Sequence, residues 1–329
     1  MFNACIVGYG AIGPVHANAI LNSPNVKLYA VCDIDKSRAE LCAKEYDCKI
    51  FTDYNDALDD ENIDVVHICI PHYLHKDFAI KALRKNKNVV LEKPVALNNA
   101  EFEEVAETVA TSDKKFCVML QNRTNNCVRK MKEILENDDD AGKLLGIIGS
   151  LNWKRDEAYY NSGEWRGKIA TEGGGLLINQ AVHLVDLMLY FGGELESIHH
   201  DIKRWHISNI EVEDTASALM QFKNNIRGIF NATNCYITDE PYYIELKFEN
   251  RHLRYADGCL YDIKQDGIEI IEKDARIKIG KNYWGNGHQT VIDNFYSTLA
   301  GETRLFPTLE DSRAAMNTVY DFYSERSKL

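Results

Sequence analysis

The glycines near the N-terminus form the first pattern that can do chemistry. Gly8-Tyr9-Gly10-Ala11-Ile12-Gly13 has the spacing G-x-G-x-x-G between an apolar run and an apolar helical segment, and Asp33 follows 20 residues after Gly13. In such a loop the first glycine permits a tight turn, the second lets the backbone approach a pyrophosphate, and the third lets helix and strand pack closely. An acid at this distance accepts hydrogen bonds from a ribose and repels a 2′-phosphate. The pattern predicts an NAD(H) site formed by these seven residues, namely Gly8, Tyr9, Gly10, Ala11, Ile12, Gly13 and Asp33.

Two alternatives remain open at this loop. The glycines can form a turn that binds no ligand. Arg38 can also accommodate a 2′-phosphate, which would favour NADP, although an exposed helix charge is the simpler interpretation of that arginine.

Three groups of polar residues follow later apolar runs. Strands of a parallel sheet all end at one edge, and ligands bind there. If the strand order is 3-2-1-4-5-6, the fifth strand is about 10 Å from the first, so Lys93 faces the nicotinamide end of a dinucleotide rather than its phosphates. An ion pair between Lys93 and Glu92 at the surface is the alternative. The residues at this predicted edge are Pro71, His72, Tyr73, His75, Glu92, Lys93 and Gln121.

A histidine in the second half of the chain has the chemistry to exchange a hydroxyl proton. His183 lies on an apolar helical segment behind Gly173-Gly174-Gly175, with Asn179 four residues earlier on the same helix face. A histidine with a pKa near 6.5 accepts or donates a proton at neutral pH, and a lysine beside the reacting oxygen stabilises an alkoxide. The three glycines would let a substrate approach the backbone. A buried core histidine is the alternative interpretation.

The elements that must position these residues change character near residue 121. Before it, short apolar runs alternate with helical segments, which indicates βαβ units and a parallel sheet. After it, most strands alternate polar and apolar residues and follow one another directly, which indicates an antiparallel sheet with one covered face. We therefore predict an α/β protein with a doubly wound parallel sheet in residues 1–121 and an α+β domain with an open, mostly antiparallel sheet in residues 122–329. The strands expected in the second part are Leu144–Trp153, Ser197–Trp205, Thr215–Phe222, Arg227–Thr233 and Tyr243–Phe248.

Composition narrows the classes of partner and compartment. Lys and Arg total 38 against 50 for Asp and Glu, and this net charge of −12 argues against nucleic acid and anionic membranes as partners. No apolar run approaches the roughly 18 residues of a membrane span. Nine cysteines without a C-x-x-C pair indicate reduced thiols and a cytoplasmic location. The spacing of His and Cys predicts no metal site.

Glu92-Lys93-Pro94, together with the glycine loop, resembles the glucose–fructose oxidoreductase/inositol dehydrogenase/MocA family. The Gly173-Gly174-Gly175 run before the helix of His183, and Trp165-Arg166-Gly167 upstream, extend the resemblance over the whole chain. The resemblance implies a Rossmann domain, a C-terminal domain whose sheet forms a homodimer or homotetramer interface, and hydride transfer between NAD(H) or NADP(H) and a sugar, cyclitol or related polyol or ketone.

The resemblance also implies roles for individual residues. Lys93 and His183 match the family's lysine and catalytic histidine. We expect Lys93, His183 and Asn179 to be catalytic and Lys93, Gln121, Asn179 and His183 to contact the substrate. The cofactor contacts would include Pro71, His75, Glu92, Lys93, Trp165 and Arg166, although Trp165-Arg166 can also be only a packed cation–π pair.

One position departs from the family. Many polyol dehydrogenases of the family carry Asp where this chain has Asn179, and an amide cannot stabilise an imidazolium as a carboxylate does. Two other functions therefore stay open: a non-catalytic sensor that binds dinucleotide, and a reductase of a non-sugar ketone or imine.

Overall fold

The chain folds into two compact units. A computed structural model describes residues 1–207, 209–275 and 285–324. The first unit comprises residues 1–121 together with 285–312, and the second comprises residues 122–275 and 313–324 within the described ranges. The division after residue 121 agrees with the predicted boundary. The prediction that everything from 122 to 329 forms one domain is wrong, because residues 285–312 belong to the first unit.

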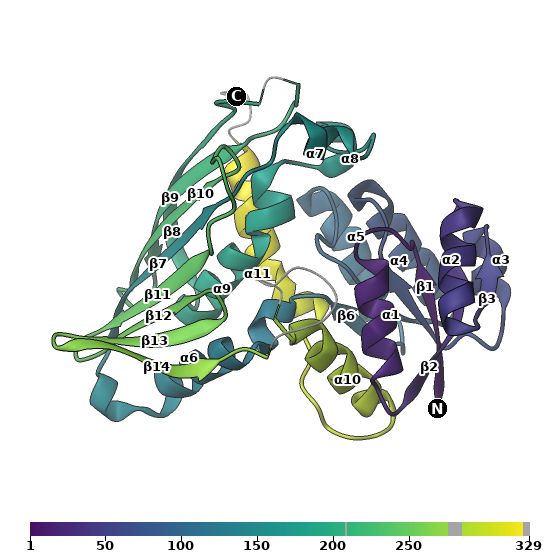
Figure 1. Cartoon of the computed structure of the whole chain (residues 1–329), viewed down its shortest axis with the longest axis horizontal. Helices are drawn as coiled ribbons and strands as arrows, with labels where there is room; N and C mark the ends of the chain where they lie inside the picture. The colour runs from purple at the N-terminus through teal and green to yellow at the C-terminus, as the bar shows by residue number, and fades with distance from the viewer. Residues whose placement is uncertain (208, 276–284, 325–329) are drawn as a thin grey trace. The chain divides into compact units, whose positions relative to one another are not determined.

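The first unit contains a six-stranded parallel sheet in the order β3-β2-β1-β4-β5-β6. This is the doubly wound order expected from the alternation of strands and helices. Its strands are β1 (Phe2–Val7), β2 (Val26–Cys32), β3 (Lys49–Phe51), β4 (Val65–Ile68), β5 (Asn88–Leu91) and β6 (Phe116–Val118). Its helices are α1 (Gly13–Leu21), α2 (Lys36–Tyr46), α3 (Tyr54–Asp59), α4 (His75–Arg84), α5 (Asn99–Ala110) and α10 (Gly287–Leu299) (Figure 1).

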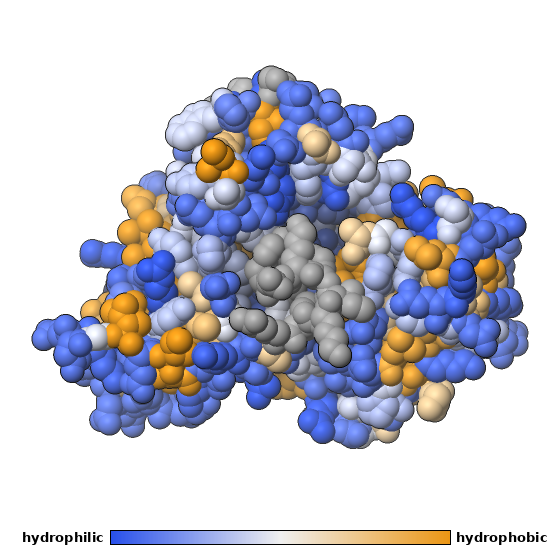
Figure 2. Space-filling view, in the orientation of Figure 1, coloured by the Kyte–Doolittle hydropathy of each residue, from blue (hydrophilic) through white to orange (hydrophobic). Residues whose placement is uncertain are grey.

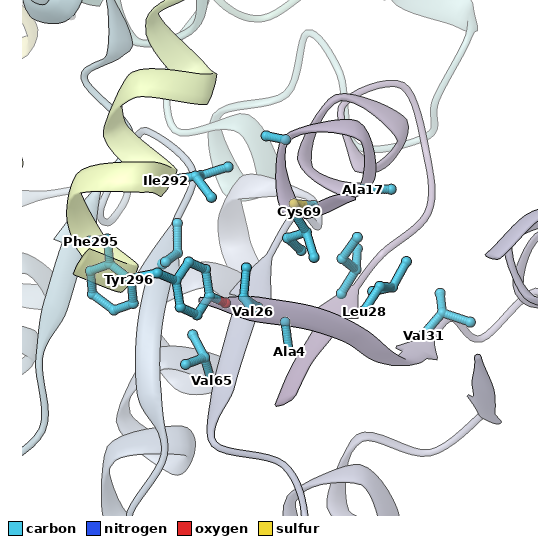
Figure 3. Close-up of a cluster of buried hydrophobic side chains, with 14 of the residues drawn as sticks. Ala4, Ala17, Val26, Leu28, Val31, Val65, Cys69, Ile292, Phe295 and Tyr296 are labelled. Atoms are coloured by element: carbon cyan, nitrogen blue, oxygen red, sulfur yellow. The ribbon is translucent and has the colours of Figure 1, made fainter. Parts of the chain in front are cut away.

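Helix α10 belongs to the first unit because its apolar face completes that unit's core. Ile292, Phe295 and Tyr296 are buried in one cluster with Val65 of β4 and Ala17 of α1 (Figure 3). Helix α10 also packs along α1. A helix from near the other end of the chain therefore closes the sheet that the first 121 residues build.

The second unit contains an eight-stranded sheet in the order β14-β13-β12-β11-β7-β10-β9-β8, in which only the β7–β10 pair is parallel among the described strands. Its helices are α6 (Asn126–Asn137), α7 (Glu157–Asn161), α8 (Ile169–Glu172), α9 (Val182–Gly192) and α11 (Leu309–Phe322), the last of which begins in the first unit. The strands are β7 (Leu144–Asn152), β8 (Leu195–Lys203), β9 (Thr215–Phe222), β10 (Arg227–Thr233), β11 (Tyr243–Phe248), β12 (His252–Ala256), β13 (Cys259–Lys264) and β14 (Gly267–Lys273). The last three strands were not predicted.

Helices cover one face of this sheet. Helix α9 packs on β7 and β10, and α6 packs on β12, β13 and β14. Strands β9 and β10 alternate buried and exposed residues, as expected for a sheet with one covered face. The face of the molecule in Figure 2 is mostly hydrophilic, with smaller hydrophobic areas between the hydrophilic ones.

The segment Ile169–Gly192 is long and apolar enough to cross a membrane by length and composition, which differs from the expectation based on uninterrupted apolar runs. However, 83% of its most apolar window is buried inside the protein. Burial by the sheet explains that composition, because a helix that is apolar all round is typical of a protein core as well as of a membrane.

Candidate functional site

The glycine loop has the three properties that a pyrophosphate needs. Gly8 has φ +90°, and a Cβ there would lie 2.5 Å from the carbonyl oxygen of Cys69. A Cβ on Gly13 would lie 2.8 Å from the carbonyl oxygen of Gly8, so the third glycine allows helix α1 to pack on the turn. In contrast, a Cβ on Gly10 would have no described atom outside its neighbours within 4 Å. The middle glycine therefore faces open space, which fits a ligand that approaches the backbone.

Helix α1 begins directly behind this loop. Among the described residues no side chain caps its N-terminus, and its first turn contains no acidic residue. Free N–H groups and the partial positive charge of a helix N-terminus favour an anionic group at this position. The residues present thus fit the diphosphate of a dinucleotide.

Asp33 lies beside the loop, as predicted. Its Oδ2 accepts a hydrogen bond of 2.7 Å from the backbone N–H of Tyr9, and its Oδ1 accepts one of 2.8 Å from that of Asp35. These bonds hold the carboxylate at the end of β2. Arg38 lies 3.5 Å from Asp35 in an exposed ion pair, which agrees with the interpretation of this arginine as a solvated helix charge.

Glu92 follows β5 directly and lies in a buried group of histidines that the sequence did not predict. His16 Nε2 lies 2.9 Å from Glu92 Oε1, and His16 Nδ1 lies 2.9 Å from His67 Nδ1. His67 Nε2 lies 2.8 Å from the hydroxyl of Tyr296. One set of protons satisfies every member: Tyr296 donates to His67, His67 donates to His16, and His16 donates to an ionised Glu92.

Electrostatics agree with this assignment. Burial alone raises the pKa of Glu92, but hydrogen bonds from His16 and His288 outweigh it and hold that pKa well below its usual value. Burial lowers the pKa of His67 far below 6.5, so this histidine is neutral. His16, Glu92 and His288 each offer one atom that could bind a metal ion, and these three atoms lie within 4.8 Å of one another. Sequence spacing, which predicted no metal site, could not detect a group assembled from three distant segments.

The remaining predicted residues at this sheet edge differ in exposure. Lys93 is half-buried and follows Glu92 directly, while Gln121 is buried at the end of the segment that follows β6. His75 is buried, and its ring nitrogens lie 2.6 Å from the carbonyl oxygen of Pro94 and 2.8 Å from that of Ile70. His75 therefore joins the loop after β4 to the loop after β5. Its role as a cofactor contact stays a prediction, as does that of the half-buried Pro71.

In the second unit, Asn179 lies within a network of polar side chains. Its Nδ2 donates to Glu172 Oε1 at 2.6 Å and lies 3.4 Å from the hydroxyl of Tyr159. The same hydroxyl accepts from Gln180 at 2.8 Å and from Arg166 at 2.6 Å. The structure thus joins Asn179 and Arg166 through the hydroxyl of Tyr159, with Glu172 and Gln180 in the same network. The roles of Asn179 toward substrate and of Arg166 toward cofactor stay predictions.

Asn179 lies on a turn of π-helix, Leu177–Ala181, which leads into α9 and the half-buried His183. Single π-helical turns are frequent at functional sites. The guanidinium of Arg166 lies 4.5 Å from the ring centres of both Trp165 and Tyr159. The cation–π pair that was the alternative interpretation of Trp165-Arg166 is present, and it extends to Tyr159, while the role of both residues as cofactor contacts stays a prediction.

The Gly173-Gly174-Gly175 run packs against protein rather than lying open to a substrate. A Cβ on Gly174 would lie 2.0 Å from the hydroxyl of Tyr323, and one on Gly175 would lie 2.1 Å from the carbonyl oxygen of Glu213. The expectation that these glycines admit a substrate to the backbone is therefore wrong for Gly174 and Gly175. Glycine is required at both positions because neighbouring segments leave no room for a Cβ atom.

The buried carboxylate of Glu213 holds the start of the helix that carries Asn179. It accepts hydrogen bonds from the backbone N–H groups of Gly175 and Leu177 and from the hydroxyl of Tyr323. These N–H groups are among those that a helix N-terminus leaves without an intrahelical partner. Glu213 was not predicted, because it lies 38 residues from the glycine that it binds.

The sequence Tyr-Trp-Gly-Asn-Gly-His at residues 283–288 is compatible with the lining of a sugar site or, equally, with the entry to a helix. Tyr283 and Trp284 lie outside the described residues. His288 is buried and its Nε2 lies 3.7 Å from Glu92, so it belongs to the histidine group of the first unit.

Comparisons with known proteins agree with both units. Residues 2–120 match a family model described as an oxidoreductase family with an NAD-binding Rossmann fold. Residues 128–254 match the GFO/IDH/MocA C-terminal domain.

Individual relatives cover most of the chain. Glucose-6-phosphate 3-dehydrogenase of Bacillus subtilis is 24% identical over 98% of this chain and 95% of its own length. Myo-inositol 2-dehydrogenase of Thermotoga maritima is 26% identical over 77% of this chain and 74% of its own length. Among solved structures, the WlbA dehydrogenase from Bordetella pertussis in complex with NADH and UDP-GlcNAcA has a TM-score of 0.86 at 22% identity, covering 99% of this chain and 97% of that one. This last likeness shows the fold.

Proposed function

Because the chain belongs to the GFO/IDH/MocA oxidoreductase family, we propose that it transfers hydride between NAD(H) and a secondary alcohol or ketone of a sugar, cyclitol or sugar derivative. The observation that supports this most directly is the glycine loop, where Gly10 faces open space beside an uncapped helix N-terminus and the fixed carboxylate of Asp33. The relatives named above act on a sugar phosphate and a cyclitol, which supports that substrate class.

The cofactor supplies the hydride chemistry when it is bound, and the chain supplies placement and proton transfer. Gly8, Gly10 and Gly13 would hold its diphosphate, and Asp33 would hold its adenosine ribose. We propose that Lys93 stabilises the negative charge that develops on the substrate oxygen. His183 would accept the hydroxyl proton during oxidation, and Asn179 would orient the substrate.

The test is turnover of a panel of polyols, sugars and sugar phosphates with NAD⁺, followed by the near-ultraviolet absorbance of NADH. We expect oxidation of at least one member. Tight NADH binding without turnover of any polyol, sugar or ketone would contradict the proposal and favour a dinucleotide-binding sensor. Activity restricted to non-sugar ketones or imines would favour a reductase instead.

Replacing Asp33 with serine tests the choice between NAD and NADP. The variant removes the charge that would repel a 2′-phosphate, so we expect the ratio of kcat/KM for NAD⁺ to that for NADP⁺ to fall at least about tenfold, the factor that corresponds to about 1.4 kcal/mol. Asp35→Ser, two residues away and exposed, is the matched control. An unchanged ratio in Asp33→Ser would contradict contact between Asp33 and the ribose.

We also propose that the open face of the second unit's sheet joins two copies of the chain. Leu219 and Ile229 are cross-strand partners and are 61% and 50% exposed, and Ile229 also pairs with the half-buried Ile148. Adjacent apolar residues on an exposed sheet are typical of a protein interface. A homodimer or homotetramer through this face would bury them.

Light scattering of Leu219→Lys combined with Ile229→Lys tests this interface. Two charges in an apolar contact cost desolvation energy without a partner, so we expect the mass to fall to that of a monomer. Leu305→Lys, at an exposed leucine of the first unit, is the control and should keep the wild-type mass. A wild-type mass in the double variant would exclude this face as the interface.

We also propose a cytoplasmic location, because nine cysteines without a C-x-x-C pair are typical of a protein from a reducing compartment.

A further inference from the structure

The network around Asn179 contains a carboxyl group that the motif analysis did not assign. Glu172 ends helix α8, seven residues before Asn179, and is 1% exposed. Its Oε1 accepts the hydrogen bond from Asn179 Nδ2, and its Oε2 accepts one from the backbone N–H of Gly167. Both oxygens of this buried carboxyl group are thus engaged by donors from two different segments.

We propose that Glu172 is a positioning residue for the substrate site, because its carboxyl group orients the side-chain amide of Asn179. Because Glu172 binds the Nδ2 of Asn179, the oxygen Oδ1 of that amide faces away from Glu172. The oxygen Oδ1 then serves as the hydrogen-bond acceptor for a substrate hydroxyl or for the imidazole of His183. This inference rests on the proposed function.

The assignment of donors and acceptors follows from chemistry. An ionised carboxylate only accepts hydrogen bonds, whereas an amide has one end that donates and one that accepts. Rotating the Asn179 amide by 180° would bring its oxygen against Glu172 Oε1, and two acceptors repel each other. The hydroxyl of Tyr159, 3.4 Å from Nδ2, already accepts from Gln180 and Arg166, so the orientation of the amide is set by Glu172.

The charges around Glu172 make this orientation sensitive to pH. Burial raises the pKa of Glu172 to about 7, against the opposing effects of the hydrogen bonds from Asn179 and Gly167 and of the charge of Arg166, while the nearby Glu213 adds to the increase. Below this pH Glu172 carries a proton and can donate to Oδ1, so the amide loses its fixed orientation. Above it, only the orientation with Oδ1 turned away from Glu172 is satisfied.

Two single variants and their combination test the proposal. In Glu172→Gln, one end of the new amide must meet the N–H of Gly167 and the other must meet Asn179. If its oxygen accepts from Gly167, its NH2 group faces Asn179, and Asn179 must turn its oxygen inward. We expect a loss in kcat/KM of about 10- to 100-fold, the range set by one mismatched buried hydrogen bond.

Asn179→Asp alone places two carboxyl groups in contact. We expect kcat/KM to fall by a similar factor and its dependence on pH to shift. The double variant Glu172→Gln/Asn179→Asp exchanges the two groups. The new amide at position 172 would then accept from Gly167 and donate to the new carboxylate at position 179, and every partner is satisfied again. We expect kcat/KM of the double variant to be at least about tenfold higher than that of either single variant, which is the effect of one restored buried hydrogen bond. A double variant that unfolds at the wild-type temperature but does not recover kcat/KM would overturn the proposal.

A second measurement does not depend on turnover. The side-chain amide signals of Asn179 in ¹H–¹⁵N spectra, assigned by their loss in Asn179→Asp, should move with pH around a midpoint of about 7 in the wild type. They should not do so in Glu172→Gln. Movement that persists in Glu172→Gln would assign the titration to a group other than Glu172 and would overturn the proposal. If no substrate is turned over but the amide titrates as expected, the proposed function fails and the role of Glu172 in orienting Asn179 stands.

Discussion

Replacing Lys93 with methionine is expected to reduce kcat by about 10²- to 10³-fold and to leave the affinity for NADH nearly unchanged. The expected loss is that of removing one group that stabilises a developing negative charge in an active site. Methionine keeps an apolar side chain of similar length, so the packing beside Glu92 and Pro94 should persist. NADH affinity should persist as well, because the proposed diphosphate and ribose contacts are made by the glycine loop and Asp33.

Steady-state kinetics with the best substrate of the panel, together with NADH titration by fluorescence, measures both quantities. Lys85→Met is the matched control, because Lys85 caps the C-terminal end of helix α4, opposite the end that carries His75, and pairs with Asp59 at the surface. Wild-type kcat in Lys93→Met would remove Lys93 from the mechanism. A parallel loss of NADH affinity would show that the main role of Lys93 is its expected contact with the cofactor rather than stabilisation of the substrate oxygen.

Replacing Glu213 with alanine is expected to lower the free energy of unfolding of the second unit by about 3 kcal/mol or more. The substitution removes a buried side chain and leaves the N–H groups of Gly175 and Leu177 and the hydroxyl of Tyr323 without their acceptor, and each buried group left unsatisfied costs about 1–3 kcal/mol. Because these N–H groups begin the helix of Asn179, activity should fall together with stability.

Urea unfolding measures this change. Glu211→Ala provides the control, since Glu211 is exposed and its side chain accepts a hydrogen bond from the backbone N–H of Ile169. We expect the control to change stability by less than about 1 kcal/mol. If Glu213→Ala lowers the free energy of unfolding no more than Glu211→Ala does, the hydrogen bonds of Glu213 to the helix start contribute little to stability.

The doubly wound sheet was predictable because its strands are short apolar runs, each followed by a helical segment. Asp33 was predictable for a similar reason, since the fingerprint fixes its distance from the glycines. The hairpins of β12, β13 and β14 were not. Strands β12 and β13 alternate buried and half-buried residues but are only five and six residues long, and β14 is mostly exposed. A local pattern predicts a strand only where burial imposes a period over enough residues.

The membership of α10 in the first unit could not be predicted either. Its apolar face, which includes Phe295 and Tyr296, shows that it is amphipathic but not which sheet it covers. For the same reason, Glu172, Glu213 and the partners of Glu92 remained hidden. Each is a common residue type whose contacts come from segments far apart in the sequence. A motif with fixed spacing reveals only residues that act together within one short segment.

The dispersed origin of the first unit has a consequence for protein engineering. A chimaera that grafts residues 1–121 onto the second half of a relative would inherit His16, His67 and Glu92 but would lose His288 and Tyr296, which α10 contributes. The imported half would then have to accept a foreign helix against its α1 and a foreign hydroxyl beside His67. Exchange of cofactor-binding halves among such enzymes therefore calls for two crossover points, so that residues 285–312 travel with the glycine loop.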